Sequence, residues 1–176
     1  MRPAWSILPD EWKQVLQQHD VRPFRAEQIL QALYRDYISS WDEATTLPKE
    51  LREKLKTDFP FTDTAILNVT QSSDGTRKLL VGFGDKTSVE TVLIPAKDRF
   101  TQCISTQVGC AMGCAFCASG SMGLVRSLSA DEIVAQYILA REFGQITNIV
   151  VMGMGEPCDN IEAVLRAIHT LTDEKA

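Results

Sequence analysis

The residues best suited to chemistry are the cysteines of the stretch "CISTQVGCAMGCAFCASG", residues 103–120. Cys110, Cys114 and Cys117 are separated by three and two residues, and Cys103 stands apart from them. Thiolates bind soft metals, and closely spaced cysteines let one loop wrap a single metal centre. Three local thiolates suit a cluster of four irons, because one iron then stays open to a ligand from outside the protein.

A structural zinc site is the alternative interpretation of the same cysteines. Such a site needs four protein ligands, commonly in two pairs set apart in the sequence. Here the fourth ligand would have to come from Cys103, Cys158 or His169. The local set of three therefore favours an iron–sulfur cluster over zinc.

Composition favours a reducing compartment for these thiols. The 176-residue chain is 44% apolar, but no apolar run is long enough to span a membrane, and the N-terminus lacks the pattern of a signal peptide. We expect a cytoplasmic protein without membrane contact, whose cysteines serve metal or redox chemistry rather than structural disulfides. The net charge of −5 argues neither for nor strongly against a nucleic-acid partner, although 14 of the 18 Lys and Arg residues lie in the first hundred positions.

Two kinds of element precede the cysteines. Residues 9–57 are expected to be helical, because apolar residues recur on one face in "FRAEQILQALYRDYI" and at every fourth position in "LPKELREKL". Three strand-like runs follow, "AILNVTQ", "TRKLLVGF" and "TSVETVLI", separated by the turn signals "SSDG" and "FGDK". This pattern predicts an antiparallel meander.

From about residue 101 the pattern alternates between strands and helices. "TQCISTQ" is a candidate strand and the cysteine-rich loop follows it. Ser129 and Glu132 form a capping box before a helix, "TNIVVMG" resembles a buried strand, and "NIEAVLRAIHTL" is a second amphipathic helix. Strand, loop and helix repeated twice predict parallel βα units.

The cysteine spacing, its place between a strand and a helix, and Phe116 before the last cysteine resemble the radical S-adenosylmethionine (SAM) superfamily. In that superfamily three cysteines bind a [4Fe-4S] cluster whose open iron holds SAM. The resemblance also implies a GGE-like stretch after the next strand, which contacts the amino end of SAM. Here "MGMGEP" stands at that place, so Gly155 and Glu156 are the expected SAM-binding residues, although Glu156 could instead cap the following helix.

The order of further motifs resembles the RlmN/Cfr family of RNA adenine methyltransferases, from about residue 8 to residue 172. These motifs are "FRAEQI", "LPKELREKL", "DGTRKLL", "VETVLIP", "CISTQVGCAMGCAFC" and "ITNIVVMGMGEP". Members of the RlmN branch methylate C2 of an adenine in large-subunit ribosomal RNA and in transfer RNA, and Cfr members methylate C8. Pro157 favours the RlmN branch.

The same resemblance implies roles for two residues outside the cluster. In this family a methylated cysteine carries the methyl group to the adenine, which leaves a protein–RNA crosslink. Cys103 matches the resolving thiol that releases the RNA through a transient disulfide, and Glu90 matches the proton acceptor. From pattern alone, Cys103 would be a small buried hydrophobe and Glu90 a solvated strand residue.

The expected fold is therefore α/β. An N-terminal helical accessory domain (1–60) and a small antiparallel meander (61–98) precede the first βα units of a radical SAM barrel (99–176). The matching region ends about halfway through the family's length, and the methyl-carrying cysteine has no counterpart here, so we expect a fragment. A catalytically inactive iron–sulfur or RNA-binding remnant is the alternative. The implied partners are ribosomal and transfer RNA and a flavodoxin-like reductant, and a monomer is expected.

Overall fold

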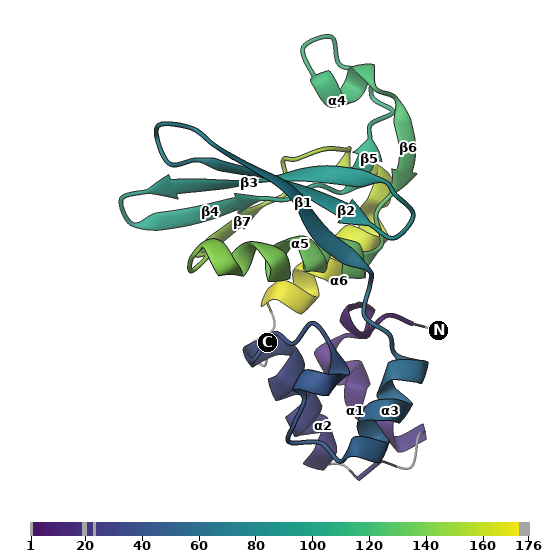
Figure 1. Cartoon of the computed structure of the whole chain (residues 1–176). Helices are drawn as coiled ribbons and strands as arrows, with labels where there is room; N and C mark the ends of the chain where they lie inside the picture. The colour runs from purple at the N-terminus through teal and green to yellow at the C-terminus, as the bar shows by residue number, and fades with distance from the viewer. Residues whose placement is uncertain (1, 19–20, 23, 173–176) are drawn as a thin grey trace. The chain divides into compact units, whose positions relative to one another are not determined.

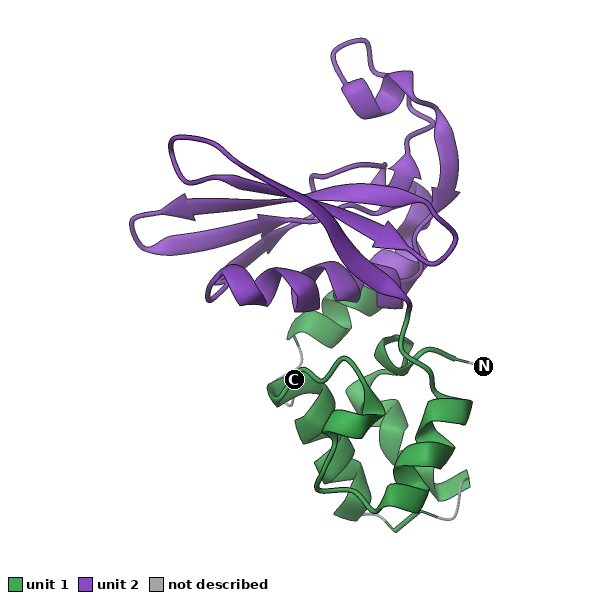
Figure 2. Ribbon diagram, in the orientation of Figure 1, with its two compact units in different colours: residues 1–62, 166–176 green, residues 63–165 purple. Residues whose placement is uncertain are grey.

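The computed structural model describes residues 2–18, 21–22 and 24–172, and the chain divides into two compact units (Figure 2). Unit 1 comprises residues 1–62 and 166–176, and unit 2 comprises residues 63–165. Helix α6 (Ile161–Thr172) begins in unit 2 and continues into unit 1. The predicted boundary after residue 98 falls within one continuous sheet, and the predicted three-domain division remains a prediction.

Unit 1 is helical, as the sequence predicts. Its helices are α1 (Pro9–Gln18), α2 (Phe24–Leu30), which continues as a π-helical turn over Gln31–Arg35, and α3 (Lys49–Asp58). Short 3-10 turns occupy Ala4–Ser6 and Trp41–Glu43. Pro48 lies just before α3, where its missing N–H is not needed.

An aromatic cluster forms the core of unit 1. Trp12 and Trp41 are almost fully buried and meet edge to face, with ring centroids 6.1 Å apart. The indole N–H of Trp41 donates to the carbonyl of Phe59 at 2.7 Å. The predicted apolar stripe over residues 29–38 is buried except at Tyr37, which is half-buried, has a φ of 53° and lies beyond the helix.

Unit 2 is built on a five-stranded sheet in the order β1-β2-β3-β4-β7 (Figure 1). The strands are β1 (Thr64–Gln71), β2 (Arg77–Phe83), β3 (Ser88–Ala96), β4 (Arg99–Cys103) and β7 (Asn148–Val150). The first three are antiparallel and confirm the predicted three-stranded meander. The next strand, β4, extends it by pairing with β3 in antiparallel, and β4 and β7 pair in parallel, as βα units require.

Helix α5 (Ala130–Ala140) lies against one face of this sheet (Figure 1). Alternate residues of β2 and β3 are fully buried on that side, namely Leu79, Val81, Val89, Thr91 and Leu93. Their neighbours along the strands point to the opposite face and, apart from Gly82, are half-buried or exposed. The predicted capping box is confirmed at the start of α5, where the backbone N–H of Ser129 donates to the Glu132 carboxylate at 2.9 Å.

A second, two-stranded sheet was not predicted. The candidate strand 101–107 ends at Cys103, and β5 (Gln107–Gly109) instead pairs in antiparallel with β6 (Leu124–Ser127). The short helix α4 (Ala118–Ser121) lies in the loop between them, and this loop projects away from the large sheet (Figure 1).

Among the residues that the structure describes, no helix is both long and apolar enough to cross a membrane.

Candidate functional site

The three clustered cysteines lie on residues 110–123, here called the cysteine loop, which joins β5 to β6. The N–H of Cys110 donates to the carbonyl of Gly123 at 3.1 Å and closes the neck of the loop. Gly109 has a φ of 74°, and a Cβ at this position would lie 1.8 Å from the same carbonyl oxygen. The neck therefore requires glycine, both for its backbone conformation and for space.

The cysteines differ in exposure and are not assembled around a common point. Cys110 is buried, Cys117 is half-buried and Cys114 is exposed, and the N–H of Cys117 donates to the carbonyl of Cys114 at 3.0 Å. Across the described ranges, no group of three or more His, Cys, Asp or Glu side chains could hold a metal ion. The structure thus places the predicted ligands on one short loop without gathering their sulfurs, and it does not assemble the zinc alternative either. The ligand assignment remains a prediction.

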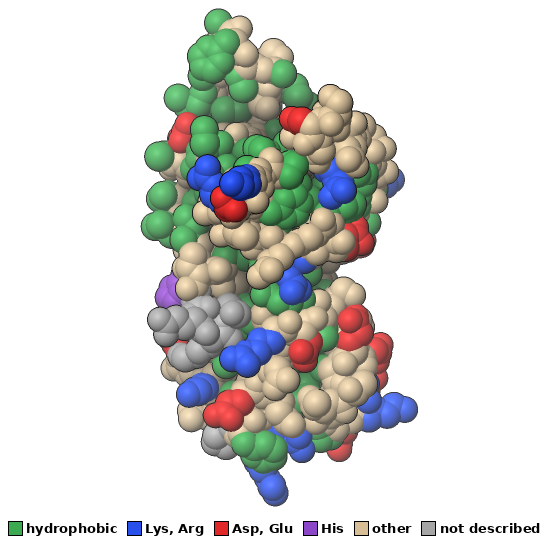
Figure 3. Space-filling view, turned by 90° about the vertical axis from the view of Figure 1, so that its left-hand side faces the viewer, with side chains coloured by type: hydrophobic (Ala, Val, Ile, Leu, Met, Phe, Trp, Pro, Cys, Tyr) green, Lys and Arg blue, Asp and Glu red, His purple; other side chains and the backbone are tan. Residues whose placement is uncertain are grey.

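The chemistry of the loop nevertheless fits an iron–sulfur cluster. Its potential donors are thiols alone, and residues 110–125 contain no charged side chain and no histidine. Apolar side chains gather at this end of unit 2 (Figure 3). The exposed large ones in this region are Met112, Phe116, Met122, Leu124 and Val125. An exposed apolar patch of this kind marks a binding site more often than a free surface, and apolar surroundings tune thiolate-bound iron.

The segment 153–156 of "MGMGEP" packs tightly against the chain that links β4 to β5. The backbone N–H of Thr106 donates to the carbonyl of Met154 at 2.8 Å, and Gly153 donates to the carbonyl of Ile104 at 3.0 Å. A Cβ on Gly153 would come within 2.7 Å of that carbonyl oxygen. Gly155 has a φ of 100°, so a side chain there would be strained in any surroundings. The glycines of this motif are thus required by the fold itself.

Gln107 connects this segment to β6, the strand that leaves the cysteine loop, and no sequence motif pointed to it. Its side chain is fully buried; the amide oxygen accepts the N–H of Glu156 at 2.9 Å, and the amide nitrogen donates to the hydroxyl of Ser127 at 3.1 Å. A Cβ on Gly155 would lie 2.6 Å from the Cβ of Gln107. A buried amide needs specific partners, and the burial of Gln107 could be seen only in the folded structure.

The carboxylate of Glu156 occupies a capping position. It accepts the N–H of Cys158 at 3.0 Å at the start of the 3-10 turn Pro157–Asn160. Cys158 is exposed, and the hydrogen bond and negative charge of Glu156 raise the pKa of its thiol. The capping role anticipated for Glu156 is therefore observed, and a role in SAM binding remains a prediction.

Glu90 and Cys103 share the face of the large sheet that α5 does not cover. Val92 of β3 pairs directly with Cys103 of β4, and Glu90 lies two residues from Val92, so the three side chains point to one side. The carboxylate of Glu90 forms an ion pair with Lys78, whose Nζ lies 2.8 Å from Oε1 of Glu90. Both side chains are about half exposed. This pair restrains the direction of the carboxylate but contributes little to stability.

Ser105 ties the strand of Glu90 to the glycine segment. Its hydroxyl donates to the carbonyl of Glu90 at 2.5 Å and accepts the N–H of Met154 at 2.8 Å. Gln136 of α5 forms two hydrogen bonds with the backbone of Ser105. Its side-chain amide accepts the N–H of Ser105 and donates to the carbonyl of Ser105, both at 2.9 Å. Ser105 and Gln136 are fully buried, so this network fixes the two predicted site regions relative to each other.

Burial raises the pKa of the Cys103 thiol, although a hydrogen bond with the backbone of Met152 partly opposes the shift. Cys103 is half-buried, and a partly desolvated thiol stays protonated to higher pH than a solvated one. Attack by this thiol on another sulfur requires the thiolate, so its reactivity must increase as the pH rises.

Comparisons with known proteins cover both units. Residues 9–59 match the family model of the ribosomal RNA large subunit methyltransferase N-terminal domain, and residues 104–175 match that of the radical SAM superfamily. The dual-specificity RNA methyltransferase RlmN of Nitratiruptor sp. is 42% identical over 183 residues, which cover 94% of this chain and 52% of that protein. The RlmN of Pelobacter propionicus is 46% identical over 150 residues, covering 85% of this chain and 43% of that protein.

A solved structure agrees with these matches. A radical SAM methyltransferase from Sphaerobacter thermophilus has a TM-score of 0.92 and 41% identity, covering 100% of this chain and 53% of that one. The chain therefore spans about half the length of the curated relatives it matches. With the helical domain, the cysteine loop and the glycine segment in the same order, the chain belongs to the RlmN family of radical SAM methyltransferases and matches its N-terminal half.

Proposed function

We propose that this chain supplies the cluster loop, part of the SAM site and two reactive side chains of an enzyme that methylates C2 of adenine in ribosomal and transfer RNA. The observation that carries the proposal is the set of contacts made by Gln107. Its buried amide links the N–H of Glu156 to Ser127, which belongs to the strand that leaves the cysteine loop. The predicted cluster ligands and the predicted SAM segment are thereby supported by one residue.

The proposed cofactors are one [4Fe-4S] cluster and SAM. Cys110, Cys114 and Cys117 hold the cluster, and Gly155 and Glu156 contact the amino end of SAM. When bound, the cluster supplies the electron that cleaves SAM and so provides radical chemistry, which an unactivated aromatic carbon requires. The side chains that surround these cysteines in the loop are uncharged and mostly apolar, and such surroundings tune a thiolate-bound cluster.

Glu90 and Cys103 act after the methyl carrier is joined to the adenine. Glu90 accepts the proton of the substituted carbon, a step for which a carboxylate within hydrogen-bond reach is suited. The Cys103 thiolate then attacks the sulfur of the carrier cysteine. The new sulfur–sulfur bond forms as the carrier's sulfur–carbon bond breaks. The electron pair of the broken bond passes to the CH2 group on the adenine, which takes up a proton to become the methyl group, and the methylated RNA is released.

The remaining proposals concern organisation and partners. Residues 1–60 form a helical accessory domain, residues 61–98 a small antiparallel meander, and residues 99–176 the first part of the radical SAM barrel. The protein is a cytoplasmic monomer, and a flavodoxin-like protein reduces its cluster. The matches to RNA methyltransferases over 85% or more of the chain support RNA as the substrate class.

Anaerobic reconstitution with iron and sulfide tests the cofactor assignment. We expect the chain to take up one four-iron cluster, whose electron paramagnetic resonance spectrum changes when SAM is added. The variant with Cys110, Cys114 and Cys117 all changed to Ala should take up none, while Cys158→Ala, a change of the exposed cysteine outside the loop, should load normally. Normal iron uptake by the triple variant would show that the ligand assignment is wrong.

A chimera tests the reaction. This chain replaces the matching half of the Nitratiruptor relative, and RNA incubated with the reconstituted chimera is analysed by mass spectrometry for 2-methyladenine. The Cys103→Ala chimera should accumulate as a covalent protein–RNA adduct that nuclease shortens on denaturing gels. If the Cys103→Ala chimera loads its cluster and releases methylated RNA at the normal rate, Cys103 is an ordinary buried residue.

A further inference from the structure

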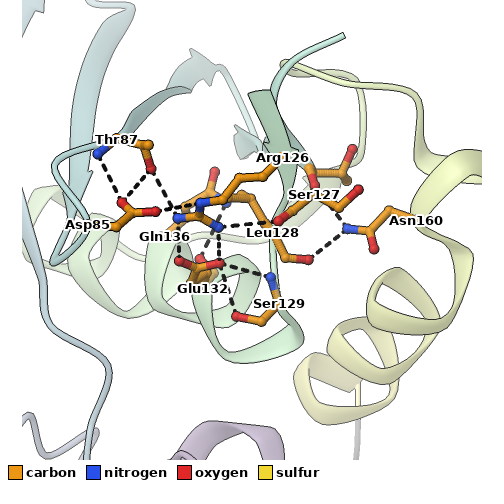
Figure 4. A network of polar contacts seen from close by, with 10 residues as sticks. Asp85, Thr87, Arg126, Ser127, Leu128, Ser129, Glu132, Gln136 and Asn160 are labelled. Atoms are coloured by element: carbon orange, nitrogen blue, oxygen red, sulfur yellow. Dashed lines mark hydrogen bonds and ion pairs between the residues drawn. The ribbon is translucent and has the colours of Figure 1, made fainter. Parts of the chain in front are cut away.

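One arginine holds the strand that leaves the cysteine loop. Arg126 lies in β6 and makes two parallel bonds to the carboxylate of Glu132, at 2.7 and 2.8 Å (Figure 4). Its Nε donates to the carboxylate of Asp85 at 2.6 Å, and its Nη2 also donates to the hydroxyl of Thr87 at 3.0 Å. A planar guanidinium bound on several sides in this way has one orientation, which a lysine could not reproduce.

The partners of Arg126 come from two other elements. Glu132 belongs to the first turn of α5, where it also accepts the N–H and the hydroxyl of Ser129. Asp85 and Thr87 belong to the turn between β2 and β3. The side chain of Glu132 is 11% exposed and that of Arg126 is 28% exposed, so this contact is more shielded from solvent than an ordinary surface ion pair. Arg126 therefore fastens β6 to the large sheet and its helix.

Nearby contacts fasten the base of the same hairpin. The side-chain amide of Asn160 donates to the carbonyl of Leu128 at 2.7 Å (Figure 4). It also donates to the carbonyl of Thr106 at 2.9 Å, so it bridges the chain after β6 and the chain before β5. Beyond this base, β5 and β6 pair in antiparallel, and the bond from Cys110 to the carbonyl of Gly123 closes the neck of the loop. The cysteine loop is thus an extension whose attachment depends on a few named contacts.

We propose that Arg126 is a positioning residue for the cysteine loop. By fixing β6 it keeps the neck closed, and the closed neck keeps Cys110 in its buried position at the start of the loop. The identity of the ligand that the loop receives rests on the proposed function. The restraint on Cys110 does not, because it is a property of the protein without a cofactor.

The first experiment measures this restraint without any metal. Each cysteine of the apoprotein is alkylated with iodoacetamide, and mass spectrometry gives the rate at Cys110 relative to that at Cys114. We expect Arg126→Met to raise this ratio about tenfold, the factor that follows from losing a charge-assisted hydrogen bond that favours the closed state. Arg126→Lys keeps the charge without the double contact, so its ratio should lie between those of the wild type and Arg126→Met.

Leu79→Ala provides the control for general loss of stability, since Leu79 is fully buried in the large sheet and belongs to neither strand of the hairpin. At a temperature well below the unfolding transitions of all variants, Leu79→Ala should leave the ratio unchanged. The proposal is overturned if Arg126→Met leaves the ratio at its wild-type value, or if Leu79→Ala raises it as much.

The second experiment uses the reconstituted protein. We expect a chelator to remove iron from Arg126→Met several times faster than from the wild type, while Leu79→Ala behaves as the wild type. Equal rates for wild type and Arg126→Met would contradict the positioning role. If the wild type takes up no iron, the proposed function fails, and the alkylation ratio in the apoprotein still decides the role of Arg126.

Discussion

Glu90 and Cys103 belong to two separate sequence motifs, and the register of β3 against β4 places them on the same face of the sheet. Cys103 pairs with Val92, so Glu90 lies diagonally across the strand pair, a relation that corresponds to a Cα separation of about 7–8 Å. Each residue alone has an ordinary explanation, as a buried thiol or a solvated carboxylate. Their common position on the face that α5 leaves uncovered is what the proposed chemistry requires, because one bound base would have to reach both.

The reactivity of Cys103 gives a prediction at the scale of one residue. Because burial raises its pKa in the folded chain, the rate of alkylation of Cys103 should reach half its maximum at a higher pH in the folded protein than in urea. Mass spectrometry after iodoacetamide treatment over a range of pH measures both curves on the same residue. Coincident curves, or a lower midpoint in the folded protein, would contradict the burial argument.

Gly155 gives a second residue-scale prediction. Gly155→Ala places a Cβ at a φ of 100° and within 2.6 Å of the Cβ of Gln107, whereas Gly113→Ala at a φ of 60° meets nothing within 4 Å. Gly113→Ala should lower the free energy of unfolding by about 1–2 kcal/mol, because of its left-handed backbone alone. The Gly155 change should cost about 1–3 kcal/mol more from overpacking.

Urea denaturation followed by far-ultraviolet circular dichroism compares the two variants. Equal losses of unfolding free energy in Gly155→Ala and Gly113→Ala would mean that the contact with Gln107 relaxes without cost.

At the scale of elements, the sequence pattern predicted those helices, strands and caps that depend on residues close together in the chain. The meander, the capping box at Ser129 and the two βα helices follow from alternation, turn residues and helical periodicity. The β5–β6 pair did not, because its strands are only three and four residues long and are separated by the cysteine loop. Their pairing depends on contacts far apart in the sequence.

The same distinction explains the two residues of the site that the sequence did not indicate. Gln107 has no local signature, since its partners Ser127 and Glu156 lie 20 or more residues away. Arg126 binds Glu132 of the next element and Asp85, which lies 41 residues away, and no sequence pattern links these three residues. The catalytic assignments could be made from a family resemblance. Gln107 and Arg126, which position the elements of the proposed site, could be identified only from the folded structure.

Asp85 provides a prediction about the attachment of β6. The hydroxyl and N–H of Thr87, together with Arg126, lower the pKa of the Asp85 carboxyl from 3.8 to about 2. A depressed pKa in the folded state means that the stabilisation is present above about pH 4 and is lost as the pH falls through about 2. The loss of unfolding free energy caused by Asp85→Asn should therefore shrink as the pH decreases over this window.

Chemical denaturation of wild type and Asp85→Asn at a series of pH values measures this difference. A difference that stays constant from neutral pH to about pH 2 would show that the ionised carboxylate does not stabilise the folded state.

At the scale of the whole chain, each unit has its own core. Unit 1 buries Trp12, Leu33 and Trp41, and unit 2 buries Leu79 and Leu93 between its sheet and α5. In unit 1, Arg166 of α6 donates to the carbonyl of Ser6 at 2.8 Å and forms an ion pair with Glu11. The final part of α6 thus contributes to the helical unit, which a division of the sequence into consecutive segments could not anticipate.

Separate cores predict separate unfolding transitions, and the chain carries a probe for each. All three tryptophans lie in residues 1–62, so their fluorescence reports unit 1, and the accessibility of Cys103 to a short alkylation pulse reports unit 2. Leu33→Ala and Leu79→Ala remove the same atoms from fully buried positions, and each should cost its own unit about 2–5 kcal/mol. In urea, Leu33→Ala should lower the fluorescence midpoint and leave the Cys103 midpoint unchanged, and Leu79→Ala should do the reverse. If either variant moves both midpoints together, the two units unfold as one cooperative body.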